Sequence, residues 1–251
     1  MLFRSVWMLP NVLALDAPLV AVVWQWFLAR QFSIPLPFVC CAVLALATWS
    51  VYLVDRCLDA ARGAVGTARH AFAARHARLL LPLGMVSGAS AFACTPWAPS
   101  VFLVPGYLLA LTVAGYFVMV HRRRAVVTQS SRGKEVLVAI CFGAGTCLVL
   151  IEAQCAAAAV ASALLFITAC WCNCRLIDRW EGGGALRWRE LALGLLLGTV
   201  CSLWAPAVVV LGSWSMAALF AVVHFGVARR NRELARCLVD FAMVVPVLWW
   251  A

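Results

Sequence analysis

The sequence has 251 residues, of which 65% are hydrophobic and 12% charged, and its formal net charge is +10. Soluble domains carry about 25% charged residues, so the composition excludes an ordinary soluble protein and predicts an all-α polytopic membrane protein. The length suits a single membrane domain over residues 1–251, because one span takes about 20 residues. The basic residues cluster between apolar runs, as they do in cytoplasmic loops, which argues against nucleic acid as a partner.

Apolar runs predict about nine transmembrane helices along the chain. In order, they cover residues 12–29, 36–55, 78–95, 100–120, 135–152, 156–177, 190–206, 210–228 and 237–250. The last run is short and contains Asp240. A terminal hairpin or an interfacial segment is therefore the alternative for that run.

The basic residues predict the orientation of these spans. With the N-terminus on the cytoplasmic side, 19 of the 20 basic residues fall on that side and only Arg30 falls outside. Cytoplasmic loops carry an excess of lysine and arginine. We therefore expect an integral protein of the cell (inner, cytoplasmic) membrane, with the lipid bilayer as its surroundings.

Two near-identical acidic motifs occur where apolar runs end. The first is Leu53-Val54-Asp55-Arg56 followed by Asp59, and the second is Leu176-Ile177-Asp178-Arg179 followed by Glu181. A carboxylate at mid-depth in a bilayer costs about 2.5–3.5 kcal/mol on insertion scales, so carboxylates near the membrane are often functional. Both motifs fall on the cytoplasmic side of the predicted topology, at the ends of the second and sixth spans.

The spacing within these motifs indicates a site that binds a phosphate ester. Residues three or four apart share a helix face, so Tyr52 and Arg62 lie on the stripe of Asp55 and Asp59. Paired carboxylates attract a cation, and Mg²⁺ usually binds one or two carboxylates together with substrate phosphates. Arginine presents a planar fork that fits phosphate oxygens. The pattern predicts a diphosphate ester at the cytoplasmic interface with its apolar tail in the bundle. Solvated helix ends with local charge neutralisation are the alternative.

These residues resemble the motifs of the UbiA superfamily of intramembrane prenyltransferases. The run from Trp49 to Asp59 is similar to the family's second-helix motif N-D-x-x-D-x-x-x-D, and the run from Ile177 to Glu181 is similar to its second acidic motif, D-x-x-x-D. Asp16 before Ala17-Pro18 resembles the polar residue before proline in the family's first helix. Lys134-Glu135 falls where the family has a basic loop before its fifth helix.

The resemblance implies a fold, an activity and residue roles. It implies about nine helices around a central cavity and transfer of a prenyl group from a prenyl diphosphate to a lipophilic acceptor of the aromatic or quinone type. Asp55 and Asp59 would bind the diphosphate through Mg²⁺, with Asp178 opposite them and Glu181 as a further metal ligand. The expected substrate-binding residues are Tyr52, Arg56, Arg62, Arg124, Arg132, Lys134 and Arg179, of which Arg124, Arg132 and Lys134 would stabilise the leaving diphosphate.

The sequence departs from the family pattern at three positions. Val51 and Tyr52 replace the first Asn-Asp pair, and Gly182 replaces the last aspartate of the second motif. Glu181 lies one residue away from that aspartate position. A non-catalytic relative that binds a lipid or a partner is therefore the second hypothesis. A transporter that uses the carboxylates as ion or proton sites is the third, although such sites usually lie near mid-membrane.

Overall fold

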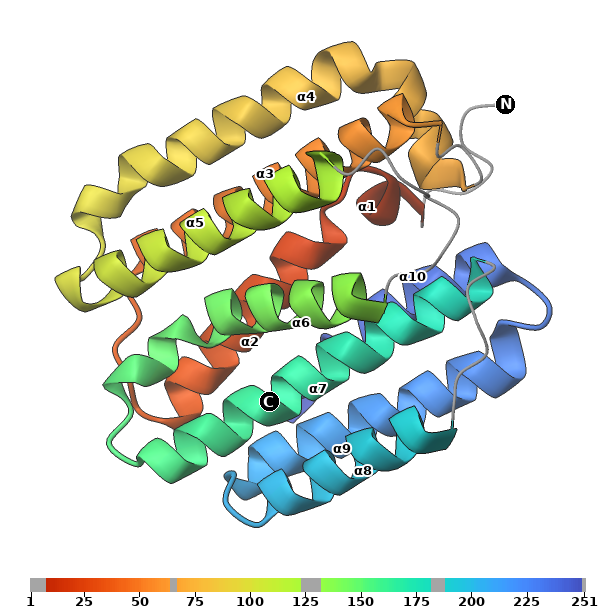
Figure 1. Cartoon of the computed structure of the whole chain (residues 1–251). Helices are drawn as coiled ribbons and strands as arrows, with labels where there is room; N and C mark the ends of the chain where they lie inside the picture. Colours follow the sequence, from red (N-terminus) through yellow and green to blue (C-terminus); the bar gives the residue numbers. More distant parts are fainter. Residues whose placement is uncertain (1–7, 64–66, 123–131, 182–187, 250–251) are drawn as a thin grey trace.

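The computed structural model describes residues 8–63, 67–122, 132–181 and 188–249, and every regular element in these ranges is helical (Figure 1). The α-helices are α1 (Leu9–Val12), α2 (Asp16–Gln31), α3 (Phe38–Ala61), α4 (Ala68–Cys94), α5 (Ser100–Arg122), α6 (Arg132–Thr146), α7 (Ala156–Trp180), α8 (Trp188–Ser202), α9 (Ala207–Val222) and α10 (Arg232–Ala242). Short 3₁₀ segments cover Thr95–Trp97, Cys147–Glu152 and Val245–Trp249, and a π-helical turn covers Val223–Val227. The all-helical prediction is confirmed.

Six helical stretches within the described ranges are long and apolar enough to cross a membrane. They are Phe38–Ala61, Ala68–Trp97, Ser100–Met119, Gly133–Glu152, Ala156–Trp180 and Ala207–Val227. Large apolar side chains are exposed along these helices, among them Met85, Val104 and Leu111, each more than 60% exposed. Such a surface is consistent with an integral membrane protein. Helices α2, α8 and α10 have 16, 15 and 11 residues, so the count of nine spans stays a prediction.

The first long helix begins later than the apolar run that predicted it. A turn with positive φ at Ala14 (57°) separates α1 from α2, which starts at Asp16 rather than at residue 12. Pro18 then lies in the first turn of α2, where its missing N–H has no intrahelical partner to lose. The backbone N–H of Ala17 donates to Asp16 Oδ1 at 3.0 Å. Proline and aspartate together therefore favour a helix start at this position.

The last apolar run also folds differently from the expected helix over 237–250. Helix α10 begins five residues earlier, at Arg232, where the Asn231 side chain accepts from the backbone N–H of Leu234 at 3.0 Å. It ends at Ala242, ahead of Pro246, which cannot donate a helical hydrogen bond. Asparagine is a preferred N-cap residue, so the side-chain cap and the proline set the two limits of this helix.

Helix α4 bends near its beginning. His76 has a non-helical backbone (φ −113°, ψ 16°), and its Nδ1 lies 3.0 Å from the carbonyl oxygen of Phe72. In a regular helix the backbone N–H of His76 would bond this carbonyl oxygen. Here the imidazole ring contacts it instead, and a side chain that inserts into the helical hydrogen bonds is a known cause of kinks. The residues before the bend include Arg69 and His70, which both line the cavity described below.

Two packed regions position the helices around that cavity. Trp24 of α2 is fully buried against Phe166 of α7, and its Nε1 donates to the carbonyl oxygen of Met243 at 2.6 Å. Helices α3 and α4 approach closely at Gly84 and Gly88, which lie on α4. A Cβ at Gly88 would lie 2.7 Å from Ser50 Oγ, so a larger residue there would require the Ser50 side chain to move. The carboxyl-terminal ends of α3 and α7 lie at the same end of the bundle (Figure 1).

Candidate active site

A cavity of about 340 Å³ opens at the end of the bundle where α3 and α7 finish. Seven of the ten carboxylates in the sequence line it: Asp16, Asp55, Asp59, Glu135, Asp178, Glu181 and Asp240. The basic side chains in its wall, among the described residues, are Arg56, Arg69 and Lys134, with His70 beside them. We call this space the polar chamber. Carboxylates outnumber cations in its wall, and two arginines outside the wall, Arg175 and Arg236, pair with three of them.

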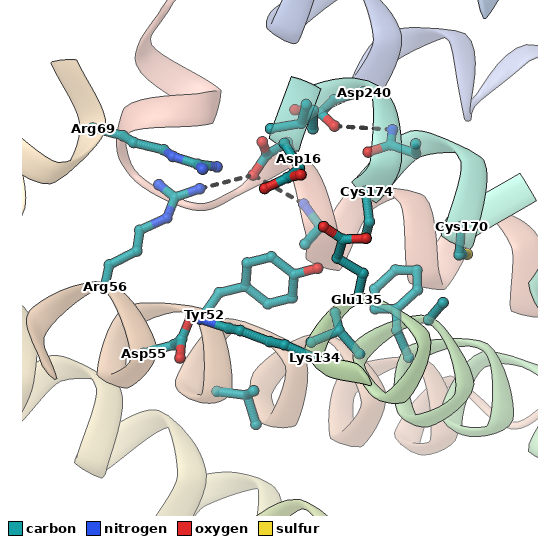
Figure 2. A pocket seen from close by; sticks show the side chains of 18 of the residues that line it. Asp16, Tyr52, Asp55, Arg56, Arg69, Lys134, Glu135, Cys170, Cys174 and Asp240 are labelled. Atoms are coloured by element: carbon teal, nitrogen blue, oxygen red, sulfur yellow. Dashed lines mark hydrogen bonds and ion pairs between the residues drawn. The ribbon is translucent and has the colours of Figure 1, made fainter. Parts of the chain in front are cut away.

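Helix α3 supplies Asp55 and Asp59 to the polar chamber from one face. The two residues are four positions apart, which is one turn, and both line the cavity. Lys134, near the start of α6, brings its Nζ to 3.6 Å from Asp59 Oδ2. Tyr52 lies one turn before Asp55 and projects its ring into the same space (Figure 2). Lys134 and Asp59 thus join α3 and α6 across the cavity with one cation and one anion.

Arg56 lines the polar chamber, but its guanidinium is engaged with the corner between α1 and α2. It is buried, and its Nη1 donates to the carbonyl oxygens of Asn11 and, at 3.2 Å, Val12. Its Nη2 lies 3.9 Å from Asp16 Oδ1 (Figure 2). The last carbonyls of a helix have no intrahelical donor. Arg56 therefore closes the end of α1, and its expected contact with substrate stays a prediction.

Arg175 holds the carboxylates around the second acidic motif. It is buried, and its Nη1 lies 2.8 Å from Glu135 Oε2 and 3.2 Å from Asp178 Oδ2. Its Nη2 lies 2.9 Å from Glu190 Oε2. One guanidinium therefore joins α6, α7 and α8, and Asp178 enters the polar chamber as part of this ion-pair network.

Glu181 is held by two further arginines. Its Oε1 lies 2.7 Å from Arg69 Nη2 at the start of α4, and it also pairs with Arg236 of α10. Arg236 in turn contacts Glu233 at 3.0 Å. Glu181 therefore ties the ends of α4, α7 and α10 together over the polar chamber. A metal ion at Glu181 would have to share this carboxylate with both guanidiniums.

A second group of carboxylates lies on the opposite wall from Tyr52 and Asp55 (Figure 2). Asn11 Nδ2 donates to Asp16 Oδ2 at 2.7 Å and to Asp240 Oδ2 at 3.0 Å. Asn173 Nδ2 donates to Asp240 Oδ1 at 3.2 Å. Helix α10, which is not among the six candidate spans, carries Asp240. Burial and the neighbouring charge of Asp16 raise the pKa of Asp240 to about 8, while the bond from Asn173 opposes this shift.

An apolar chamber of about 440 Å³ adjoins the polar one. The two share Val51, Tyr52, Tyr116, Val138 and Phe142 as a common wall. The lining of the apolar chamber comes from α2 to α6 and from the 3₁₀ segment Cys147–Glu152, and none of the described residues in it is charged. An ionic group and an apolar group of one ligand could thus occupy neighbouring spaces.

Two polar side chains of the apolar chamber have an atom without a hydrogen-bond partner in the described chain. Tyr116 in the shared wall is 8% exposed, and its hydroxyl has no partner. Gln25 of α2 is 5% exposed, and its Oε1 has no partner. Buried polar atoms are nearly always hydrogen-bonded. These two atoms are exceptions, because each is enclosed by protein and has no partner in the described chain.

The remaining expected substrate-binding residues lie away from these chambers or outside the described parts. Arg62 follows the end of α3 and is exposed, and Arg179 is exposed on α7. Neither lines the polar chamber. Arg124 lies outside the described residues, as does the side chain of Arg132, whose backbone starts α6. Sequence patterns missed Asp240 as a site residue. An aspartate within an apolar run could have indicated it.

The fit to Mg²⁺ depends on oxygens that a ligand would bring. Within the described ranges, no group of three or more histidine, cysteine or carboxylate side chains is close enough to hold a metal ion by itself. Mg²⁺ commonly binds one or two protein carboxylates and completes its shell with phosphate oxygens and water. Asp55 and Asp59 on one face, with Asp178 in the same cavity, fit that mode of binding.

Comparisons with known proteins give no relative for this chain. No protein-family model matches the sequence, no curated protein matches it, and no solved structure matches the fold.

Proposed function

We propose that this chain is an intramembrane prenyltransferase of the UbiA type, with nine spans and its polar chamber open to the cytoplasm. It would transfer a prenyl group from a prenyl diphosphate to a lipophilic acceptor of the aromatic or quinone type. The observation that carries the proposal is that Asp55, Asp59, Lys134 and Asp178 line one cavity beside an apolar chamber. Diphosphate and prenyl tail require these two environments side by side.

The residues of the polar chamber would share the work of binding the diphosphate. Asp55 and Asp59 would hold Mg²⁺, with Asp178 as a weaker third ligand because Arg175 already neutralises part of its charge. Bound Mg²⁺ would neutralise the negative charge that develops on the leaving diphosphate. Lys134 would donate to a terminal phosphate oxygen from its position 3.6 Å from Asp59.

The proposed transfer leaves atoms and charge balanced. The bond between C1 of the prenyl group and the diphosphate oxygen breaks, and its electron pair leaves with the diphosphate. A carbon or oxygen of the acceptor forms the new bond to C1. The proton that the acceptor loses would pass to a carboxylate of the polar chamber. The shared wall of Tyr52, Tyr116 and Phe142 would exclude water from C1 and surround it with aromatic faces.

The experiment is a transfer assay on the purified protein in detergent with Mg²⁺. A series of prenyl diphosphates would be offered, and both diphosphate release and binding of the unreactive thiodiphosphates would be measured. We expect Mg²⁺-dependent binding that is lost in Asp55→Asn with Asp59→Asn and retained in Glu152→Gln, a carboxylate that lines neither chamber. Absence of binding and of turnover with every chain length would contradict the proposal.

The ion pairs of the second motif favour one alternative. Asp178 and Glu181 are engaged by Arg175, Arg69 and Arg236, which is compatible with a non-catalytic relative that binds a lipid or a protein partner. In that case the Asp55→Asn, Asp59→Asn variant would keep its biological activity. Prenyl thiodiphosphate would then bind without any turnover of the natural compound.

A further inference from the structure

The wall of the polar chamber opposite Tyr52 and Asp55 carries two carboxyl groups that one amide joins (Figure 2). Asn11 Nδ2 donates to Asp16 Oδ2 at 2.7 Å and to Asp240 Oδ2 at 3.0 Å. Asp16 begins α2, and Asp240 lies in the last turn of α10. Both residues line the chamber and are only partly buried, so each keeps some surface toward the cavity. We call Asp16 and Asp240 the acid pair.

Asp240 differs from the other carboxylates of the chamber in the kind of partner that it has. Arginine or lysine side chains pair with five of the others, namely Asp16, Asp59, Glu135, Asp178 and Glu181. Asp240 instead accepts hydrogen bonds from the amide nitrogens of Asn11 and Asn173, and no arginine or lysine of the described residues pairs with it. A carboxylate without a nearby cation keeps a high affinity for a proton. Asp240 is therefore well suited to take up a proton inside the chamber.

The second carboxyl group of the acid pair strengthens this affinity. Two carboxylates held by the same amide repel each other when both are ionised. Burial, the charge of Asp16 and a hydrogen bond to its carboxyl group raise the pKa of Asp240 to about 8. The other charged or titratable groups that interact with Asp240 are Tyr52 and Arg56 of α3, Arg69 of α4, Cys174 of α7, and Arg236 and Cys237 of α10. A base is most effective when its pKa lies near the working pH.

The position of Asp240 suits removal of a proton from the acceptor. In the proposed transfer, Asp55 and Asp59 of α3 hold the diphosphate through Mg²⁺. Asp240 lies across the chamber from Asp55 (Figure 2). An acceptor that bonds C1 from the side away from the leaving diphosphate has its reacting atoms aligned with the breaking bond. The same placement brings the acceptor to the wall that carries Asp240.

We propose that Asp240 is the general base of the transfer, and that Asn11, Asn173 and Asp16 position it. This assignment rests on the proposed prenyl transfer to an acceptor with a phenolic hydroxyl group. The hydroxyl proton passes to a carboxylate oxygen of Asp240, and the electron pair of the broken O–H bond stays on the acceptor, which forms the bond to C1. The diphosphate leaves with the electron pair of the C1–O bond, and Asp240 later releases its proton to water.

The pH profile of the transfer tests this assignment. The purified protein in detergent would receive Mg²⁺, a prenyl diphosphate and hydroquinone as the acceptor. The wild-type rate should rise with pH up to about 8 and level off above it, because the ionised carboxylate is the active form. Asp240→Asn should lower the rate about 100-fold and remove this rise, as for loss of a general base.

Two further measurements distinguish a base from a structural residue. Asp240→Asn should bind prenyl thiodiphosphate as tightly as the wild type and should melt no lower at pH 7, because its amide can donate to Asp16 as the protonated acid does. Asp240→Glu keeps a carboxyl group and should recover part of the rate. The matched control Glu152→Gln, at a carboxylate that lines neither chamber, should keep the rate and the pH profile of the wild type.

Infrared spectroscopy provides a readout that requires no transfer. The wild type at pH 6 should show the C=O band of a protonated carboxyl group, and this band should disappear at pH 9. The band should be absent from Asp240→Asn and present in Glu152→Gln. A pH-dependent band that Asp240→Asn retains unchanged would overturn the assignment of the proton to Asp240.

The outcomes separate this assignment from the proposed function. Transfer by Asp240→Asn with the rate and pH profile of the wild type would overturn the role of Asp240 and leave the transferase standing. A parallel loss of rate and of melting temperature in Asp240→Asn would show a structural role and overturn the base. A wild type that neither binds nor turns over a prenyl diphosphate would contradict the transferase, and the base with it.

Discussion

Two four-residue motifs that differ only by valine and isoleucine end in different surroundings. In Leu53-Val54-Asp55-Arg56, the arginine turns inward, is 6% exposed and bonds the carbonyls at the end of α1. In Leu176-Ile177-Asp178-Arg179, the arginine is exposed, and the buried guanidinium one turn earlier, Arg175, takes its place as the internal cation.

The difference shows that a repeated motif predicts location better than role. Both aspartates reach the same cavity, because both helices end at the same side of the bundle. Asp178 is fixed by a short contact with Arg175, whereas Asp59 on α3 meets Lys134 across 3.6 Å. The α7 carboxylates hold the bundle together, while we assign the α3 carboxylates to the ligand. The substitutions below test this division of roles.

The largest expected effect is on stability, at Arg175. In Arg175→Met, the carboxylates of Glu135, Asp178 and Glu190 lose the cation that separates them. Removing one partner of a buried ion pair typically costs about 3–5 kcal/mol. Unfolding in detergent, followed by circular dichroism, should show this loss, with partial recovery in Arg175→Lys. A neutral result for Arg175→Met would remove the structural role that we assign to the α7 motif.

The next largest effect is expected on activity, at the α3 motif. Asp55→Asn with Asp59→Asn should lower the rate of the proposed prenyl transfer about 100- to 1000-fold, comparable to the loss of a main electrostatic contact to a developing charge. The melting temperature should change little. Asp178→Asn should lose less activity and more stability, and Glu152→Gln should lose neither. Equal activity losses at Asp55 and Asp178 would contradict the division between the two helices.

A matched pair of arginine substitutions compares the fourth residue of each motif. Arg56→Gln should destabilise the protein by about 1–3 kcal/mol, because the buried carbonyls of α1 and the Asp16 carboxylate lose their partner. Arg179→Gln, at an exposed position, should stay within about 0.5 kcal/mol of the wild type. Chemical unfolding of the two variants side by side measures the difference. Similar values for both would mean that Arg56 does not secure the end of α1.

The smallest expected effect depends on pH and concerns Asp240. Its pKa is raised to about 8 in the folded protein, so the folded state holds a proton that the unfolded chain releases near pH 4. The wild type therefore loses stability as pH rises from about 4 to about 8, with Asp16, Arg69 and Arg236 as the neighbouring charges.

Asp240→Asn carries no ionisable group and resembles the protonated acid. The variant should gain about 1–2 kcal/mol relative to the wild type between pH 6 and pH 8, and the difference should level off above pH 8. Melting temperatures at intervals across this range measure it. A constant difference between the two proteins would show that Asp240 titrates with its ordinary pKa.

Local patterns in the sequence predicted the helices and the end of the bundle where the site lies. The expected spans over 36–55 and 156–177 correspond to α3 and α7, because long apolar runs with flanking charges are strong local signals. The acidic motifs predicted the end of the bundle at which the cavity lies, for a similar reason. A carboxylate beside an apolar run is rare and therefore informative.

Contacts between distant segments could not be predicted in the same way. Asn11 and Asp240 are 229 residues apart and meet through one hydrogen bond. Arg56 and Asn11 are 45 residues apart, and the engagement of Arg56 depends on the turn at Ala14. Each of these is decided by tertiary neighbours rather than by periodicity, so one sequence offers no signal for them.

The position of Lys134 allows the site to be labelled chemically. It is the single lysine in the sequence, and its ammonium group lies in the polar chamber beside Asp59. An amine-reactive reagent would therefore find one lysine side chain within these 251 residues. Mass spectrometry of the acylated peptide would count occupied sites directly, without a mutation, a fluorophore or knowledge of the natural substrate.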